Sequence, residues 1–515
     1  MKPSITRRDF MKRSSQTMIA AATIPYIFKS TPAKAFSLPD PDEMQLGDVY
    51  RHFGVTESVI RNVMAEALSM GGDYCDIYFE HSTTNTIGLE DKEVNRAYTD
   101  VELGAGIRVL KGDQTGYSFT EELSPKAMKL AAKTAAAIAG SGKSAPPQSL
   151  KLHDIPDYYP IETPWEQVGI DQKIPYLQKI NDKIFALDSR VIKSNIWFVN
   201  HTSIVLIATS EGRIVHDYRP MARIIASCTA EDNGKRESNY FDLAGRQGIE
   251  FFTPENVNRL ASEAIARTVA LFKAVKPEAG VMPVVLAAGS SGILLHEAIG
   301  HGMEADFNRK KISIFSDKIG KPVAEPFVTI VDNGTNPHIR GSINVDDEAN
   351  DTEKTILVEN GILKNYLHDR ISARYYGVKP TGNGRRESFR YSVQPRMRNT
   401  YMENGPHTKE EIIASVKKGL YAESFTNGEV AIGAGDFTFY VKSGALIEDG
   451  KITQPVKDVN IIGNGPEVLR KVIMAGNDMT MSEGGWTCGK GGQRVPVSQG
   501  LPTVLVSEIT VGGLS

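Results

Sequence analysis

Two histidines and a glutamate stand close together in the segment His296–His301 and could bind a metal ion. The segment has the sequence His-Glu-Ala-Ile-Gly-His, in a chain that contains only 10 histidines. Imidazoles and carboxylates are the side chains from which metal-dependent hydrolases build their sites. The segment therefore indicates a metal site in which His296 and His301 are ligands.

The spacing of these histidines differs from that of the common zinc-protease motif, in which they are four residues apart on one helix face. Residues five apart diverge by roughly 140° on a straight α-helix, so both imidazoles reach one ion only if the backbone departs from α geometry. Gly300 and Gly302 flank His301, and glycine allows a helix to end or to bulge. We predict that the helix ends at the site and that His301 reaches back from its last turn.

A zinc site needs a third protein ligand besides two imidazoles. Glu304 and Asp306 follow closely in the sequence, whereas Cys488 lies far away in the glycine-rich segment 484–492. Small neighbours leave a sulfur accessible, although a lone cysteine is most often a buried apolar side chain. The residues alone leave these three candidates open.

Composition excludes two classes of protein. The chain has 3 cysteines, an odd number that is too small for a disulfide-rich scaffold. Cys75 and Cys228 lie in apolar strand patterns and are expected to be buried. Acidic side chains outnumber basic ones by 62 to 59, and the excess grows when residues 1–35 are set aside. We therefore expect no nucleic-acid partner.

Residues 1–35 have the layout of an export signal. Arg7-Arg8 precede an apolar run over residues 18–27, and Ala33-Lys34-Ala35 resembles a cleavage site. This pattern predicts a twin-arginine signal peptide, export to the periplasm, and a fold that begins near Phe36. No later stretch of 18 or more apolar residues follows, so no membrane span is expected.

Periodicity in the rest of the chain predicts an α+β protein with three domains. Residues 36–145 are expected to form an N-terminal α/β-type domain, residues 150–277 a middle α+β domain, and residues 282–515 a β-rich C-terminal domain. Helices are expected over residues 57–70, 125–139 and 254–275, and short strands over residues 75–79, 106–110, 204–207 and 223–226.

The C-terminal domain is expected to be an antiparallel or barrel-like sheet. Asn360-Gly361 and Asp449-Gly450 each separate two apolar runs, which is typical of two-residue hairpin turns. The acidic run Asp346-Asp347-Glu348 lacks the ligand spacing of a calcium loop and is interpreted as a solvated loop. Arg385-Arg386-Glu387 is interpreted first as a solvated charge cluster.

Four ordered motifs of the chain resemble those of the TldD/PmbA family of zinc metallopeptidases, on the catalytic TldD side. They are His296–Phe307, Thr381–Glu387, Pro395–Thr400, and Cys488-Gly489-Lys490 followed by Pro496-Val497. The resemblance covers essentially the whole chain after the export signal and is densest from Pro283 onward.

The resemblance implies a site and an activity. His296, His301 and Cys488 match the metal-ligand positions for Zn²⁺, and Glu297 matches the catalytic carboxylate. It also implies that Arg385, Arg386 and Arg396 bind the substrate or order the site. The implied substrates are unfolded or small peptides.

The resemblance also implies a partner, a related subunit of the TldE/PmbA type that lacks the metal motif; a homodimer is the other arrangement considered. A second interpretation of the chain is a non-catalytic, peptide-binding subunit with a structural metal. In that case Glu304 or Asp306 would complete a closed site with four protein ligands.

Overall fold

The computed structural model describes residues 39–139, 142, 144–431 and 434–513. The chain divides into two units, Met1–Pro39 and Asp40–Ser515, and the second carries every element described below. The predicted export signal, residues 1–35, lies outside the described residues.

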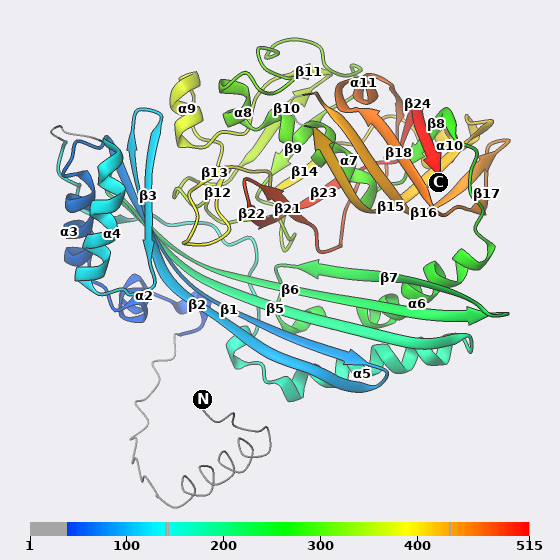
Figure 1. The fold of residues 1–515 in the computed structure, drawn as a ribbon, viewed down its shortest axis with the longest axis horizontal. Helices are drawn as coiled ribbons and strands as arrows, with labels where there is room; N and C mark the ends of the chain where they lie inside the picture. The colour runs from blue at the N-terminus through cyan, green and yellow to red at the C-terminus, as the bar shows by residue number, and fades with distance from the viewer. Residues whose placement is uncertain (1–38, 140–141, 143, 432–433, 514–515) are drawn as a thin grey trace, which may run out of the picture. The chain divides into compact units, whose positions relative to one another are not determined.

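A long curved sheet is built from the N-terminal and middle regions together (Figure 1). Its strand order is β3-β2-β1-β5-β6-β4, with β7 paired to β6. The strands are β1 (Tyr74–Glu90), β2 (Glu93–Lys111), β3 (Gln114–Thr120), β4 (Lys151–Leu152), β5 (Val191–Thr209), β6 (Arg213–Asp232) and β7 (Lys235–Gly245). Because β1 pairs directly with β5, the two predicted domains share one sheet; the domain boundaries in sequence stay a prediction.

Helices of this part begin at hydroxyl caps. Thr56 accepts a hydrogen bond from the Val59 N–H at the start of α3, and Ser124 caps α4 in the same way. The helices are α2 (Leu46–Phe53), α3 (Glu57–Leu68), α4 (Pro125–Ala136), α5 (Ile170–Leu187) and α6 (Pro254–Ala270). In Figure 1, α5 and α6 lie on one side of the long strands and the C-terminal region lies on the other. Within the described residues, none of the helices combines the length and the apolar character that crossing a membrane requires.

Five strands of the C-terminal region close on themselves. The pairings run β15-β8-β24-β18-β16, and β16 pairs back to β15, which forms a small barrel around an apolar core. The strands are β8 (Gly280–Leu286), β15 (Lys418–Ala431), β16 (Asp436–Glu448), β18 (Val459–Asn464) and β24 (Val504–Gly513), with β17 (Lys451–Pro455) and β19 (Val472–Ala475) attached. The predicted fold class, α+β with a β-rich C-terminal domain, is confirmed.

A second sheet of the same region has the order β11-β10-β9-β14-β23-β20. Asn360 and Gly361 join β10 to β11 with φ angles of 49° and 77°, which is the predicted tight hairpin turn. Asp449 and Gly450 do the same between β16 and β17. The strands are β9 (Ile330–Asn333), β10 (Lys354–Glu359), β11 (Ile362–Leu363), β14 (Asn399–Met402), β20 (Thr480–Met481) and β23 (Ser498–Leu501).

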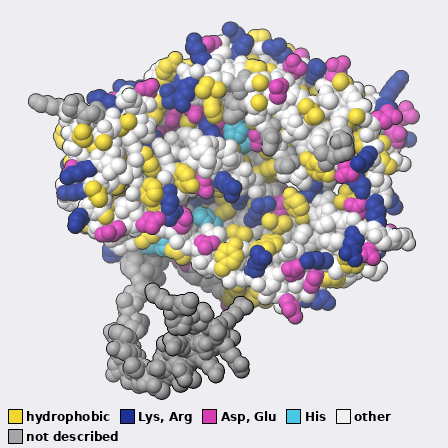
Figure 2. Space-filling view, in the orientation of Figure 1, with side chains coloured by type: hydrophobic (Ala, Val, Ile, Leu, Met, Phe, Trp, Pro, Cys, Tyr) yellow, Lys and Arg dark blue, Asp and Glu magenta, His cyan; other side chains and the backbone are white. Residues whose placement is uncertain are grey.

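Short elements complete the C-terminal region. They are the strand pairs β12 (Gly384–Arg385) with β13 (Gln394–Pro395) and β21 (Thr487–Lys490) with β22 (Gln493–Pro496), and the helices α8 (Ala305–Arg309), α9 (Arg370–Tyr376), α10 (Lys409–Ala414) and α11 (Gly465–Arg470). On the face seen in Figure 2, basic and acidic side chains are intermingled.

Candidate metal centre

The helix that carries both histidines departs from α geometry between them. It begins as α7 (Ile293–Leu295), widens into a π-helical turn, η7 (His296–Gly300), and closes with a 3-10 turn, η8 (His301–Met303). The N–H of His301 donates to the carbonyl of His296, the i→i+5 bond of a π-helix. This wide turn brings the two imidazoles to a centroid separation of 5.0 Å. His301 lies in the last turn, as predicted.

The distant cysteine completes a cluster of three metal-binding side chains. Ligand atoms of His296, His301 and Cys488 all lie within 4.8 Å of one another, and the Cys488 Sγ is 3.3 Å from the His301 Nε2. All three side chains are buried. The hairpin β21–β22 brings Cys488 there, and Arg396 holds that hairpin by donating to the Cys488 carbonyl at 2.6 Å.

The cluster fits a zinc ion. Within the part of the chain that the structure describes, the buried Nδ1 of His296 has no hydrogen-bond partner, although a buried polar atom normally has one. Two imidazoles and one thiolate are a donor set that zinc accepts, and they leave its fourth position open.

Electrostatics within the cluster favour the thiolate. Burial opposes ionisation of Cys488, but the imidazoles of His301 and His296 outweigh it and hold the pKa of the thiol well below its usual range. Burial likewise opposes protonation of His301, and the charges of Glu304 and Cys488 raise the pKa of its imidazole. The deprotonated sulfur is the form that binds a metal.

Glu304 contacts His301 and lies outside the three-residue cluster. Its Oε2 is 2.9 Å from the His301 Nδ1 and 3.1 Å from the Lys490 Nζ. Burial would raise the pKa of Glu304, but Lys490 and His301 lower it to about 2. The ionised carboxylate therefore fixes the ring of His301 with its Nε2 directed at the cluster. Asp306 accepts from Lys490 at 2.8 Å and is not part of the cluster either.

Glu297 lies beside the cluster and reaches solvent. Its Oε2 is 3.9 Å from the His301 Nε2, and its side chain is 19% exposed. Burial raises the pKa of this carboxyl, while the charges of His296 and His301 lower it in part. A carboxylate with a raised pKa at the edge of a metal cluster is suited to accept and return a proton.

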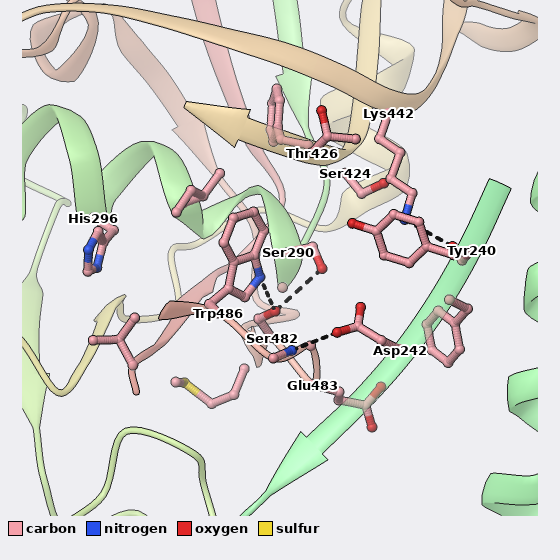
Figure 3. Close-up of a pocket in the computed structure, with 18 of the residues that line it drawn as sticks. Tyr240, Asp242, Ser290, His296, Ser424, Thr426, Lys442, Ser482, Glu483 and Trp486 are labelled. Atoms are coloured by element: carbon pink, nitrogen blue, oxygen red, sulfur yellow. Dashed lines mark hydrogen bonds between the residues drawn. The ribbon is translucent and has the colours of Figure 1, made fainter. Parts of the chain in front are cut away.

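A cavity of about 570 Å³ leads to His296 and Glu297. One wall of the cavity is formed by strands β6 and β7 of the long sheet and by helix α6. The other wall is formed by the C-terminal region. Figure 3 shows His296 on one side of this cavity, with Tyr240 and Lys442 on the opposite side. The volume is typical of sites for small ligands or short peptide segments.

The three predicted substrate-binding arginines lie away from the cavity lining. Arg385 donates to the carbonyls of Met397 and Pro496, and Arg386 donates to that of Asp347. Both arginines are buried, so the interpretation of this segment as a solvated cluster is wrong for them; the third residue, Glu387, is exposed. Together with Arg396 they order the main chain around the site; a role in substrate binding stays a prediction.

The acidic run Asp346-Asp347-Glu348 is also buried, so its interpretation as a solvated loop is wrong. Asp347 pairs with Arg219 at 2.6 Å, and Glu348 pairs with Arg108 at 2.7 Å. These arginines belong to the long sheet, and no local sequence pattern indicated that they would meet the acidic run. Cys75 and Cys228 are buried free thiols, as predicted.

Comparisons with known proteins agree over the length of the chain. Family models of the PmbA/TldA metallopeptidases match three regions: domain 1 over residues 75–139, the central domain over residues 163–272, and the C-terminal domain over residues 279–513. The metalloprotease TldD homologs of Buchnera aphidicola (strain APS) and Haemophilus influenzae are 38% and 39% identical, over 86% of this chain and 93% of theirs.

Two further comparisons concern the metal and the fold. A zinc metalloprotease TldD homolog of Saccharolobus solfataricus is 28% identical over 87% of this chain and 98% of its own. The crystal structure of TldE from Thermococcus kodakarensis has a TM-score of 0.71 and 18% identity, over 89% of this chain and 99% of that one. At this identity the likeness establishes the shared fold.

Proposed function

Since this chain belongs to the TldD/PmbA family of metallopeptidases, we propose that it is a zinc-dependent peptidase of the His-Glu-x-x-x-His type. His296, His301 and Cys488 would hold the ion, and Glu297 would be the catalytic carboxylate. One observation carries the proposal: three buried donors converge within 4.8 Å beside a carboxylate that reaches a cavity of about 570 Å³.

The ion and the protein have separate tasks in this proposal. A bound zinc ion would polarise the scissile carbonyl and make a water molecule more acidic. Glu297 accepts the proton of that water and passes it to the leaving amine, which its raised pKa and partial exposure permit. Glu304 keeps the His301 ring in place through the 2.9 Å contact to Nδ1.

We propose unfolded or small peptides as substrates, because the cavity is large enough for a short peptide segment and too small for a folded domain. The alternative of a closed structural metal site is not favoured. Glu304 and Asp306, the residues that would close it, are engaged with His301 and Lys490.

The proposal is tested with purified, zinc-loaded protein and an unstructured peptide. Wild type is expected to bind one zinc ion per chain and to cleave the peptide. Glu297→Gln should keep the zinc and lose about 10²–10⁴-fold in rate, the usual contribution of a general acid–base group. His296→Ala should lose both zinc and cleavage. Full cleavage by Glu297→Gln would rule out the proton-transfer role.

A partner and a location complete the proposal. Because a known TldE has this fold, we propose that the active form pairs this chain with a related subunit of that type; a homodimer is the alternative. The Arg7-Arg8 motif supports export through the twin-arginine route to the periplasm. Copurification from the periplasmic fraction tests both points, and loss of export in Arg7→Lys/Arg8→Lys tests the signal.

A further inference from the structure

Lys442 places a buried amino group in the wall of the cavity that reaches the metal centre. The residue lies on β16 and is only 9% exposed. Its Nζ donates to the Tyr240 carbonyl at 2.9 Å and lies over the Tyr240 ring (Figure 3). An ammonium has three N–H groups, and this carbonyl takes one of them.

The other basic side chains of the cavity wall each have a carboxylate partner. The ion pairs are Arg223–Asp242, Arg259–Glu483 and Arg267–Glu263. Among the described residues that line the cavity, Lys442 is the basic residue for which no carboxylate lies within ion-pair distance. An ammonium is costly to bury without a counter-charge, so this amine would keep its charge near neutral pH only with an anion beside it.

A hydroxyl without a partner lies on the neighbouring strand. Ser424 lies on β15 in the same cavity wall, and its buried Oγ has no hydrogen-bond partner among the described residues. The register pairs Ser424 with Ser443, the residue after Lys442, and Figure 3 shows Ser424 and Lys442 next to each other. The wall therefore presents a basic amine and a free hydroxyl from two adjacent strands.

We propose that Lys442 and Ser424 form a subsite for a carboxylate of the peptide substrate, so that this enzyme prefers peptides carrying an anionic group a short distance from the scissile bond. The inference rests on the proposed peptidase function. A carboxylate accepts from both donors and supplies the missing counter-charge. Burial, together with the charge of Arg267, lowers the pKa of Lys442 to about 6, and a bound anion would favour its charged form.

The carboxylate could belong to the C-terminus of the peptide or to an Asp or Glu side chain. The two sources of the carboxylate are distinguished by measuring the binding of three labelled tetrapeptides by fluorescence anisotropy. The zinc-loaded Glu297→Gln variant is used because it keeps the peptides intact. The first has a free C-terminus, the second is its neutral amide, and the third is an amide with one Glu. We expect the first or the third to bind about tenfold tighter than the neutral amide, since a hydrogen bond to a charged group contributes about 1.5–3 kcal/mol.

Two variants and a control test whether Lys442 and Ser424 form the subsite. Lys442→Met should remove the preference for peptides with a carboxylate. Ser424→Ala should reduce this preference severalfold, and it serves as the test if Lys442→Met does not fold. Lys418→Met is the matched control, because Lys418 lies on the same barrel and pairs with Glu278 at the surface. Equal binding of the three peptides, or an unchanged preference in both variants, would overturn the inference. Failure of wild type to cleave any peptide would instead contradict the proposed function.

Discussion

At the scale of single residues, the proposed metal site depends on a carboxylate that contacts His301. Glu304 accepts from the Nδ1 of His301, and Lys490 neutralises its charge. Without that acceptor the imidazole could rotate or protonate at the wrong nitrogen. Such partners of metal-binding histidines typically contribute 10–100-fold to metal affinity.

We therefore expect Glu304→Gln to weaken zinc binding by about 10–100-fold, measured by competition with a chelator. Asp306→Asn is the control, since Asp306 also accepts from Lys490 but lies outside the contacts of the two imidazoles. Equal zinc affinity in wild type and Glu304→Gln would show that the His301 ring needs no such support.

At the scale of elements, the helix that carries His296 lies directly on a strand. Gly292 precedes this helix, and a Cβ added there would lie 2.9 Å from the backbone of Gly500 on β23. Backbone cannot rotate away as a side chain can. The close approach of α7 to β23 therefore requires glycine at position 292.

Gly292→Ala should lower the free energy of unfolding by about 1–3 kcal/mol, the usual cost of overpacking, and should displace the histidines, which weakens zinc binding. Urea unfolding and zinc titration measure the two effects. Gly489→Ala is the control, because a Cβ at that position meets no atom within 4 Å although Cys488 is adjacent. A stable, zinc-binding Gly292→Ala would contradict the packing argument.

At the scale of the whole described unit, a buried ionic network joins the long sheet to the C-terminal region. Arg108 on β2 donates to Asp76 on β1 at 2.7 Å and pairs with Glu348 at 2.7 Å. Arg386 reaches the same Asp76 at 3.2 Å. All four side chains are fully buried. Both walls of the cavity are thus fixed relative to each other.

Arg108→Met leaves the buried Glu348 without its arginine partner and Asp76 with Arg386 alone, so it should cost about 3–5 kcal/mol of unfolding free energy. Denaturant unfolding checks this value. Lys418→Met, which breaks an exposed pair with Glu278, should change the free energy little. Similar small losses in both variants would contradict a stabilising role for the network.

The stability of the protein is expected to depend on pH through a carboxyl group at the same interface. Glu80 on β1 accepts from the Phe389 N–H and the Ser203 hydroxyl, and burial raises its pKa from 4.5 to about 7. The folded state then holds a proton that the unfolded state releases above pH 4.5. Its contribution to stability is fully present below that pH and is lost as the pH rises to about 7.

Glu80→Gln should abolish this part of the pH dependence, because a neutral amide can accept from Phe389 and donate to Ser203. The difference in unfolding free energy between wild type and variant should fall between about pH 5 and pH 8. Parallel stability curves over that range would show that the carboxyl of Glu80 is not protonated in the fold.

Features set by residues close together in the sequence were predicted better than features set by residues far apart in the sequence. The Asn360-Gly361 and Asp449-Gly450 turns and the segment His296–His301 are short patterns with a direct physical meaning. The strands β1 and β5 are far longer than their predicted apolar cores, because pairing between them carries polar residues into the sheet. Buried arginines such as Arg386 were missed, since only the fold brings their carboxylate partners to them.

The central claim is that Cys488 and the two histidines bind one zinc ion. X-ray absorption of the zinc-loaded protein tests it directly. We predict one sulfur at about 2.3 Å and two nitrogens at about 2.0–2.1 Å from the metal, with the sulfur lost in Cys488→Ser. A shell that contains only nitrogen and oxygen in the wild type would contradict the account.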